Sequence, residues 1–277
     1  MRTIVHMSDL HFGRVDRALI EPLRRRVHAL APHVTVVSGD LTQRAKPDQF
    51  REARRFLDSL PGARIVVPGN HDVPLYNLFQ RFFTPLSKYQ RFISDDLEPT
   101  YRDEEMVVVG INTARSLVFK GGRVNEEQVE AVRAKLCALP ESIAKVVVSH
   151  HPFDLPEHMD DDDIVGHANR AMHMFSRCGA DVLLAGHVHV SHAGDTTERY
   201  KIDGYAALVV QAGTATSTRG RGEANSFNAL RVSPDEVTVD RYSWREGVGE
   251  FELSTSETFR RSGEGWSRNP PPSRPSP

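Results

Sequence analysis

Apolar and polar positions along the first two thirds of the chain form short β-rich runs separated by helical patterns. Apolar runs predict strands at residues 3–8, 34–39, 63–69, 106–112, 145–151 and 181–187. Apolar residues at helical spacing predict helices at 16–30, 47–60, 125–138 and 168–178. These strands are apolar on both faces, which is typical of sheets covered by helices.

After residue 190 the pattern changes to strands alone. The runs are RYKIDG (199–204), AALVVQAG (206–213), FNALRVS (227–233), EVTVDRYSW (236–244) and EFELSTSETF (250–259). We expect them to form a largely antiparallel second half that packs on the first. The expected fold class is therefore α/β, a layered αββα sandwich of two mixed β-sheets flanked by helices.

Two segments interrupt this pattern. Residues 74–100 form a helical, aromatic-rich insertion, which is either a packed surface excursion or a lid over a site. Residues 263–277 form a Pro- and Ser-rich tail that we expect to be disordered. The remainder, residues 1–262, is expected to be a single domain with the insertion inside it, as a chain of 277 residues allows.

Composition and charge narrow the class of protein. The formal net charge is −2, so the protein lacks the broad positive field of a general nucleic-acid binder. We therefore expect no stable nucleic-acid partner. No run approaches the roughly 20 apolar residues of a transmembrane segment, and the N-terminus does not resemble a signal peptide.

Cys137 and Cys178 lie far apart and are expected to be small core residues, not a disulfide. The expected location is cytoplasmic, and the oligomeric state stays open, a homo-oligomer included.

Five of the predicted strands end in a polar cluster. The clusters are Asp9 with His11, Asp40, Asn70 with His71 and Asp72, His150 with His151, and His187 with His189. Ligand sites in open α/β sheets form outside the carboxyl ends of the strands, so the five clusters would converge in one crevice. A turn, a helix cap or a core histidine would explain each cluster alone, but not their joint occurrence at strand ends.

The side chains in these clusters favour a metal site. They offer carboxylates, imidazoles and one amide but no thiolate, a mixture that suits Mn, Fe or Zn. Residues i and i+2 of an extended chain point the same way, so Asp9 and His11 can bind one ion together. Seven candidate ligands exceed what one tetrahedral zinc needs. They fit two ions about 3.5–4 Å apart that share a bridging carboxylate, as in two-metal phosphoryl-transfer sites.

In chain order the motifs are SDLH (8–11), GD (39–40), GNHD (69–72), SHHP (149–152) and GHVH (186–189). This series resembles the calcineurin-like metallophosphoesterases, whose pattern is D-x-H, G-D, G-N-H-[DE], H and G-H-x-H, and no ligand is missing. The surrounding residues are most similar to the branch that contains class III cyclic-nucleotide phosphodiesterases and related bacterial phosphodiesterases. The Ser/Thr protein phosphatases differ, because they have G-D-x-V-D-R-G where this chain has GDLTQRA (39–45).

The resemblance implies a role for each polar residue. One ion would be held by Asp9, His11, Asp40 and His189, and the other by Asp40, Asn70, His150 and His187, so that Asp40 bridges. His150 is assigned because the family ligand directly precedes a residue-Pro pair, and His151 becomes a candidate for lining the substrate pocket. His71 would donate a proton to the leaving alkoxide, and Asp72 would hold the tautomer of its ring.

The function implied is that of a metal-dependent phosphohydrolase. The expected activity is hydrolysis of a small phosphodiester, cyclic nucleotide or glycerophosphodiester-like, with a metal-bound hydroxide as nucleophile. Alternatives are a phosphomonoesterase, a nucleotide-sugar or lipid pyrophosphohydrolase, a nuclease, or a non-catalytic scaffold. The complete ligand set and His71 argue against the scaffold, and no P-loop motif offers another route.

Candidates for substrate contact come from arginines in two loops. Arg14 follows DLHFG, and Arg219 and Arg221 lie in a Gly/Thr-rich loop, where they contact substrate or are only solvated. Guanidinium groups pair bidentately with phosphate. The acidic segment EHMDDDDIVGH (157–167) is either a solvated loop or a gate that disfavours polyanions.

Overall fold

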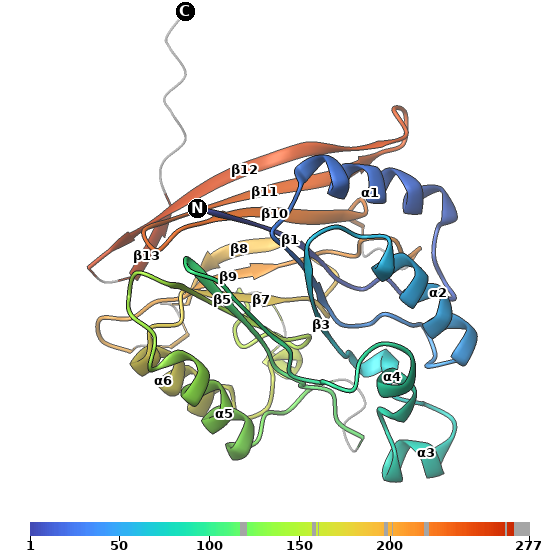
Figure 1. The fold of residues 1–277 in the computed structure, drawn as a ribbon, viewed down its shortest axis with the longest axis horizontal. Coiled ribbons are helices and arrows are strands. Elements are labelled where there is room, and N and C mark those ends of the chain that lie inside the picture. The colour runs from blue at the N-terminus through green and yellow to red at the C-terminus, as the bar shows by residue number, and fades with distance from the viewer. Residues whose placement is uncertain are drawn as a thin grey trace, which may run out of the picture.

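Two β-sheets lie face to face, with helices on the outer side of each, in the computed structural model of the chain (Figure 1). The structure describes residues 1–116, 121–156, 159, 161–196, 199–200, 202–218, 222–263 and 265–268. This arrangement confirms the predicted layered α/β sandwich of two mixed sheets flanked by helices.

The first sheet joins the N-terminal strands to the C-terminal ones. Its order is β13-β12-β11-β10-β1-β2-β3, with β1, β2 and β3 parallel and the other neighbours antiparallel. The strands are β1 (Arg2–Met7), β2 (Val34–Ser38), β3 (Ala63–Val67), β10 (Ser226–Val232), β11 (Glu236–Arg245), β12 (Glu250–Ser262) and β13 (Gly265–Arg268). Helices α1 (Arg17–Leu30) and α2 (Pro47–Asp58) connect the parallel strands.

The second sheet has the order β4-β5-β6-β7-β9-β8, in which β5, β6, β7 and β9 are parallel. Its strands are β4 (Thr100–Arg102), β5 (Met106–Gly110), β6 (Ala144–Val148), β7 (Val182–Ala185), β8 (His192–Asp195) and β9 (Leu208–Gln211). Helices α5 (Glu126–Leu136) and α6 (Ala168–Cys178) connect the central strands. Among the described residues, no helix combines the length and the apolar character that a membrane span needs.

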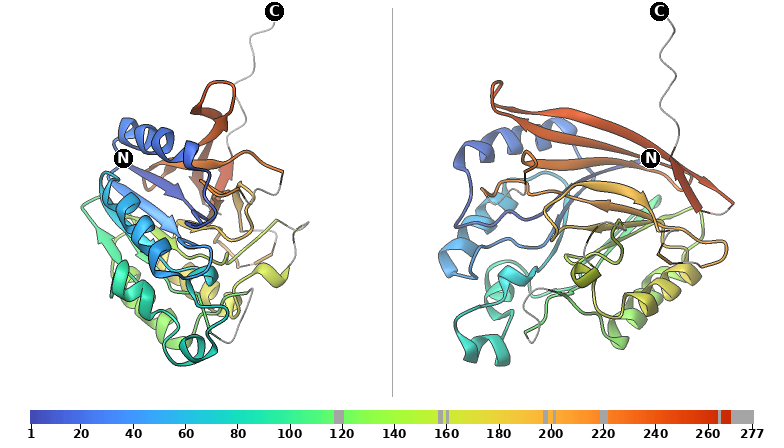
Figure 2. Two further views of the ribbon diagram at one scale, coloured as in Figure 1. Left: turned by 90° about the vertical axis from the view of Figure 1, so that its right-hand side faces the viewer. Right: turned by 180° about the vertical axis from the view of Figure 1, so that it is seen from behind.

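Three hydrophobic clusters separate the four layers. One lies between the two sheets and contains Ile4, Val108 and Leu184. A second joins the first sheet to α1 and α2, and a third joins the second sheet to α5 and α6. Figure 2 shows the helices on opposite outer sides of the paired sheets. Strands that are apolar on both faces therefore have a packing partner on each side, which explains their continuous apolar runs.

The C-terminal half differs from the sequence expectation in its pairing. We expected an antiparallel half packed on the first, but β8 and β9 extend the second sheet while β10 to β13 extend the first. β9 pairs in parallel with β7. The strand expected at 199–204 is absent from the described part of that run, and β8 takes the edge position beside β9. The chain also remains in the sheet beyond residue 262, because β13 pairs with β12 and Trp266 is buried.

Cys137 and Cys178 form a disulfide, which corrects the expectation of separate core thiols. They are 41 residues apart in the chain, but α5 and α6 lie side by side and both run to a cysteine at their C-terminal ends. The two Cα atoms are consequently 4.2 Å apart. The disulfide removes the argument for a reducing compartment, which relied on two free thiols.

The insertion at 74–100 contains two short helices, α3 (Leu78–Phe83) and α4 (Ser87–Phe92). Helix α4 is anchored in the core. The buried Tyr89 donates a hydrogen bond from its hydroxyl to the carbonyl of Val66 at 2.9 Å, and the ring of Phe92 stacks on that of Phe50. Part of the insertion is thus packed as the simpler interpretation expected, while α3 lies farther from the sheets (Figure 1).

A buried histidine in β1 leads to a prediction about pH and stability. Burial lowers the pKa of His6 to about 3 because the charged ring would lose its hydration, and the charge of Asp9 offsets this only in part. The ring Nε2 lies 2.9 Å from the hydroxyl of Ser38. Since the unfolded chain binds the proton with a pKa near 6.5, protonation favours unfolding. The stabilisation from neutral His6 is therefore complete above about pH 6.5 and declines as the pH falls towards 3.

We expect the free energy of unfolding of the wild type to fall by about 1.4 kcal/mol more than that of His6→Gln between about pH 7.5 and 5.5. Glutamine does not titrate but can still bond to Ser38. Urea unfolding of both metal-free proteins at the two pH values measures the difference, and contributions from the other histidines cancel in the comparison. Identical pH dependence in the two proteins would contradict this role for His6.

Candidate metal centre

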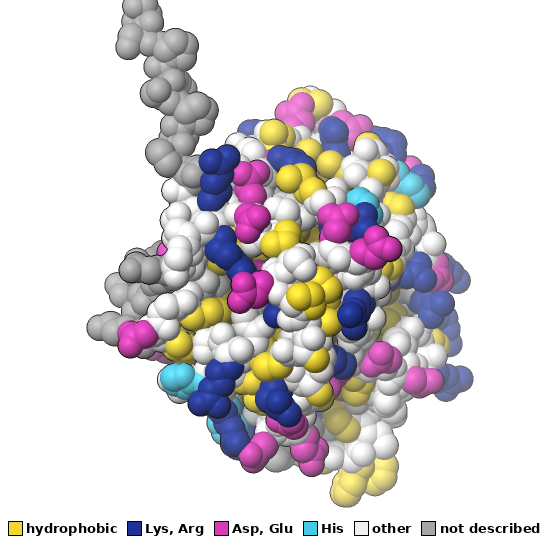
Figure 3. Space-filling model, turned by 60° about the vertical axis from the view of Figure 1, so that its left-hand side comes forward, with side chains coloured by type: hydrophobic (Ala, Val, Ile, Leu, Met, Phe, Trp, Pro, Cys, Tyr) yellow, Lys and Arg dark blue, Asp and Glu magenta, His cyan; other side chains and the backbone are white. Residues whose placement is uncertain are grey.

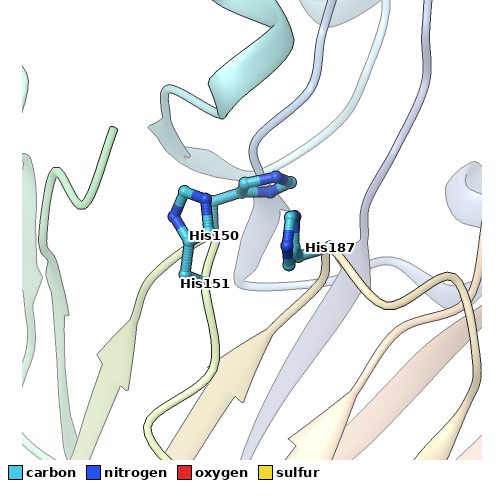
Figure 4. Close-up of side chains that lie close together, drawn as sticks. All are labelled: His150, His151 and His187. Atoms are coloured by element: carbon cyan, nitrogen blue, oxygen red, sulfur yellow. The ribbon is translucent and has the colours of Figure 1, made fainter. Parts of the chain in front are cut away.

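The polar clusters follow the carboxyl ends of strands in both sheets, and the sheet pairing brings these ends together. Asp9 and His11 follow β1, Asp40 follows β2, and Asn70 begins the short 3₁₀ helix η1 (Asn70–Asp72) after β3. His150 and His151 follow β6, and His187 and His189 follow β7. Figure 4 shows the rings of His150, His151 and His187 gathered at the ends of their strands. The convergence expected from the sequence is therefore present across the two sheets.

The backbone at these positions is strained. Eight non-glycine residues in the described part of the chain have positive φ, and five of them are predicted ligands. These five are Asp9, His11, Asp40, His187 and His189, with φ between 49° and 72°. Left-handed backbone is unfavourable for such residues and tends to persist at functional sites. The D-x-H and H-x-H pairs thus converge through left-handed turns, not through the extended chain that we expected.

Glycines leave room for ligands from other strands. A Cβ on Gly39, where φ is +91°, would lie 2.5 Å from Nδ1 of His150. A Cβ on Gly69 would lie 2.2 Å from Oδ1 of Asp40. The glycines of the GD and GNHD motifs are therefore required by close approach between segments that are distant in the sequence.

The first ligand group consists of Asp9, His11, Asp40 and His189, whose donor atoms all lie within 4.8 Å of one another. Oδ1 of Asp9 is 3.4 Å from Nε2 of His11 and 3.1 Å from Nε2 of His189. Asp9 and His11 are fully buried. These are the four residues that the family resemblance assigned to one ion.

The second group contains His150, His151 and His187, again with donor atoms within 4.8 Å of one another. Asn70 belongs beside them, since its Oδ1 lies 3.0 Å from Nε2 of His150. Nδ1 of His150 bonds to the carbonyl of Ser38 at 2.7 Å, which directs Nε2 towards the cluster. Nδ1 of His151 lies 2.8 Å from the hydroxyl of Thr113. The structure therefore places His151 in the same group as His150 and His187.

Asp40 lies between the two groups. Its Oδ2 is 3.7 Å from Nε2 of His11, and its Oδ1 is 3.5 Å from Nε2 of His150. Burial by itself would raise the pKa of Asp40, but the neighbouring charges, that of His150 first, hold it well below its usual range. Burial by itself would lower the pKa of His150, and Asp40 reverses the shift. A buried carboxylate that stays ionised and attracts positive charge on two sides is suited to cations.

Several of the candidate metal-donor atoms have no hydrogen-bond partner within the cluster, and bound cations would provide one. Among the described residues, Oδ1 of Asp9 and both ring nitrogens of His11 are buried without a hydrogen-bond partner. Buried polar groups normally have such partners, and an ion held by Oδ1 of Asp9 and Nε2 of His11 would supply one to each of these two atoms. Carboxylate, imidazole and amide donors with no thiolate match Mn, Fe or Zn. The residues present therefore fit the metal ions that the sequence predicted.

His71 and Asp72 occupy different environments. Nδ1 of His71 lies 3.0 Å from the carbonyl oxygen of Gln43, to which it can donate. The carboxylate of Asp72 accepts bonds from the backbone N–H groups of Leu41, Thr42 and Gly69 and from the Thr42 hydroxyl. We expected Asp72 to hold the His71 tautomer, but the structure gives that contact to Gln43. Asp72 instead ties the loop after β2 to the loop after β3.

Asp163 adds a carboxylate that sequence reasoning did not assign to the site. It is buried, and its Oδ1 lies 3.4 Å from Nε2 of His187. A carboxylate beside a ligating imidazole orients the ring and raises its basicity. One feature of the sequence could have indicated that Asp163 is buried. It is the last of four aspartates and directly precedes the apolar pair Ile164-Val165. The acidic segment is thus not wholly a solvated loop.

Of the three arginines proposed to contact substrate, the structure describes Arg14. Arg14 is exposed, and its carbonyl accepts a hydrogen bond from the N–H of Thr218 at 3.2 Å. The DLHFG loop is thereby tied to the segment that leads towards Arg219. Arg219 and Arg221 themselves lie outside the described residues.

Comparisons with known proteins agree with this geometry. A cAMP/cGMP dual specificity phosphodiesterase of Mycobacterium tuberculosis is 27% identical over 293 residues, covering 94% of this chain and 86% of that protein. A glycerophosphodiester phosphodiesterase of Enterobacter lignolyticus is 24% identical over 204 residues, covering 67% of this chain and 70% of that protein. An uncharacterized protein of Bacillus subtilis is 25% identical over 191 residues, and the chain spans 61% of its length.

A solved structure and a family profile complete the comparison. A dimetal phosphatase from Danio rerio superposes with a TM-score of 0.67 at 14% identity, covering 94% of this chain and 99% of that one, which supports the fold alone. The profile of the family described as Calcineurin-like phosphoesterase matches residues 2–191, which include all five motifs. The chain therefore belongs to the calcineurin-like phosphoesterases.

Proposed function

We propose that this chain is a dinuclear metal-dependent phosphodiesterase that hydrolyses a small phosphodiester of the cyclic-nucleotide or glycerophosphodiester class. The observation that carries the proposal is the position of Asp40, whose two oxygens face two separate groups of metal-ligating side chains. The substrate class is supported by the two relatives that are described as phosphodiesterases.

In this proposal two sets of four residues would hold two ions, and Asp40 would belong to both sets. Asp9, His11 and His189 complete one set, and Asn70, His150 and His187 complete the other. When bound, two ions would neutralise charge on the phosphate in the transition state and activate water as the nucleophile. Asp9 and Asp40 are the only carboxylates in the proposed sets. Two divalent ions would therefore leave the site net positive, which favours a phosphate.

In this proposal His71 is the general acid, and its contacts support that role. Its backbone N–H donates to Oδ1 of Asp40 at 2.8 Å, and its ring lies edge-on to the ring of His11 with centroids 4.9 Å apart. With Nδ1 held by the Gln43 carbonyl, Nε2 is the nitrogen that would give its proton to the leaving oxygen. Asn70 and His71 thus divide the GNHD motif between metal binding and proton transfer.

A substrate panel tests this function. Protein reconstituted with Mn²⁺ is assayed with cyclic AMP, a glycerophosphodiester, a phosphomonoester and a nucleotide sugar. We expect kcat/KM for one of the diesters to exceed that for the monoester and the pyrophosphate by at least about tenfold, the effect of about 1.4 kcal/mol in transition-state binding. Chelation should abolish turnover, and returning Mn²⁺ should restore it.

The same panel separates the alternatives. Faster hydrolysis of the monoester would indicate a phosphomonoesterase, and faster hydrolysis of the nucleotide sugar would indicate a pyrophosphohydrolase. Absence of turnover on every substrate, in protein shown by elemental analysis to hold its metal, would contradict an enzymatic role and favour a scaffold.

A further inference from the structure

Helix α3 buries its charged residue and exposes its apolar residues, which is the opposite of what a surface helix normally does. Its one charged residue, Arg81, is buried and donates to the carbonyl of Pro74 at 3.2 Å. Its four large hydrophobic residues are exposed instead: Leu78, Phe79, Phe82 and Phe83. Helices on a globular surface normally direct apolar residues inward and charges outward. The exposed face is therefore a feature that requires a partner.

Among the residues that the structure describes, most exposed large hydrophobic side chains lie in this segment. Tyr76 is 78% exposed, Phe79 70% and Phe83 73%, and with Leu78 and Phe82 they make up five of the eight large hydrophobic side chains exposed in the described part of the chain. The rings of Phe79 and Phe83 contact each other, with centroids 4.9 Å apart. We call these five residues the aromatic face. Leu78, Phe79, Phe82 and Phe83 have the i, i+1, i+4, i+5 spacing that places residues on one side of a helix, whereas isolated exposed hydrophobic residues would need no explanation.

The chain segments next to the aromatic face carry more basic than acidic residues. Residues 73–94 contain three basic residues and no acidic ones, and the neighbouring loop 41–47 contains two basic residues and no acidic ones. Arg44, Lys46 and Arg91 are exposed, and the guanidinium of Arg44 lies over the ring of Tyr76, 5.7 Å from its centroid. Acidic residues follow at Asp48, in the first turn of α2, and at Asp95 and Asp96, beyond the end of α4. On the face shown in Figure 3, by contrast, basic and acidic side chains are interspersed.

We propose that the aromatic face docks on an anionic lipid bilayer. Exposed aromatic rings beside basic side chains suit the boundary between anionic headgroups and acyl chains. A second copy of the chain is a poorer partner, since a two-fold dimer through this patch would bring like charges together. Docking would also bring the metal centre close to the membrane surface, because Arg44 directly follows Gln43, whose carbonyl contacts His71.

Vesicle co-sedimentation tests the proposal. Full-length protein is mixed with vesicles of phosphatidylcholine alone or of phosphatidylcholine with phosphatidylglycerol. We expect binding to the anionic vesicles, weakened by added salt, and little binding to the neutral ones. Phe79→Ser combined with Phe83→Ser should lower the partition coefficient on anionic vesicles by at least about tenfold, because two exposed rings are removed.

A matched control uses two exposed hydrophobic residues elsewhere. Val248→Ser with Leu253→Ser removes side chains that are 61% and 52% exposed near the turn between β11 and β12, and binding should stay within about twofold of the wild type. Thermal unfolding should show the same midpoint for both variants and the wild type, because the replaced residues are exposed. If the aromatic variant is unstable, Phe83→Ser alone takes its place.

Three results would overturn the proposal: no sedimentation with anionic vesicles, an equal loss of binding in the control variant, or equal binding to neutral vesicles. Sedimentation velocity without lipid measures the oligomeric state and so tests the alternative partner, a second copy of the chain. A dimer that the aromatic substitutions convert to monomer, in protein that does not bind vesicles, would make the aromatic face an interface between two copies. Turnover of a soluble diester should be the same in all these variants, so this test stands apart from that of the reaction.

Discussion

Asp40→Ala should lose both metal ions and with them nearly all activity. One oxygen of Asp40 faces His11 and the other faces His150, so this substitution removes a donor from each ligand group. Metal ions contribute several kcal/mol to transition-state stabilisation, which corresponds to a loss of about 10³-fold or more in kcat/KM. Elemental analysis after reconstitution and desalting should find about two ions in the wild type and close to none in the variant.

His189→Ala is the matched control for the bridging role. His189 belongs to the first group, with its Nε2 3.1 Å from Oδ1 of Asp9, so this variant should retain the ion of the second group. Circular dichroism checks that both variants are folded. Asp40→Ala protein that keeps one tightly bound ion, as His189→Ala is expected to do, would show that Asp40 does not bridge.

His71→Ala should slow a diester with an alkoxide leaving group by about 10²–10⁴-fold, the usual contribution of a general acid. An alkoxide needs a proton in order to leave, whereas p-nitrophenolate is stable without one. The same variant should therefore slow a p-nitrophenyl diester much less. Its metal content should match that of the wild type, because His71 contacts Asp40 through its backbone N–H, which alanine keeps.

The comparison of the two substrates separates the roles open to His71. His173→Ala serves as the control, because His173 is an exposed histidine on α6, away from the strand ends. It should leave both rates unchanged. Equal losses on both substrates in His71→Ala, together with loss of metal, would assign His71 to support of the metal centre and not to proton transfer.

Much of the fold could be predicted because its strands are buried on both faces. Short β-branched runs such as VTVV and KVVV favour central strands, and the helices between them follow from apolar spacing. Pairing partners were harder to predict for the C-terminal strands. β9 is an apolar run that would suit either sheet, and only its position beside β7 makes it parallel. Strand patterns encode burial, but they do not encode which neighbour supplies it.

The residues of the candidate site could be predicted where their type and their local motif indicate metal binding. Carboxylate, imidazole and amide donors after strand ends are visible in SDLH, GD, GNHD and GHVH without any coordinates. The contact between Gln43 and His71 was not visible, because a backbone carbonyl leaves no mark on the sequence. Asp163 was hidden for another reason, since three neighbouring aspartates share its type and only burial beside His187 distinguishes it.

The sequence by itself determined the layered α/β architecture, the order of the polar clusters and the kind of metal they suit, because apolar periodicity and donor chemistry are local properties. The tertiary structure alone decided the Cys137–Cys178 disulfide, the left-handed turns at the predicted ligands and the outward direction of the aromatic face. Each of these depends on which distant segments come into contact, or fail to, once two sheets and their helices are packed together. Such contacts are set by the packing of the whole chain, and no stretch of the sequence carries them.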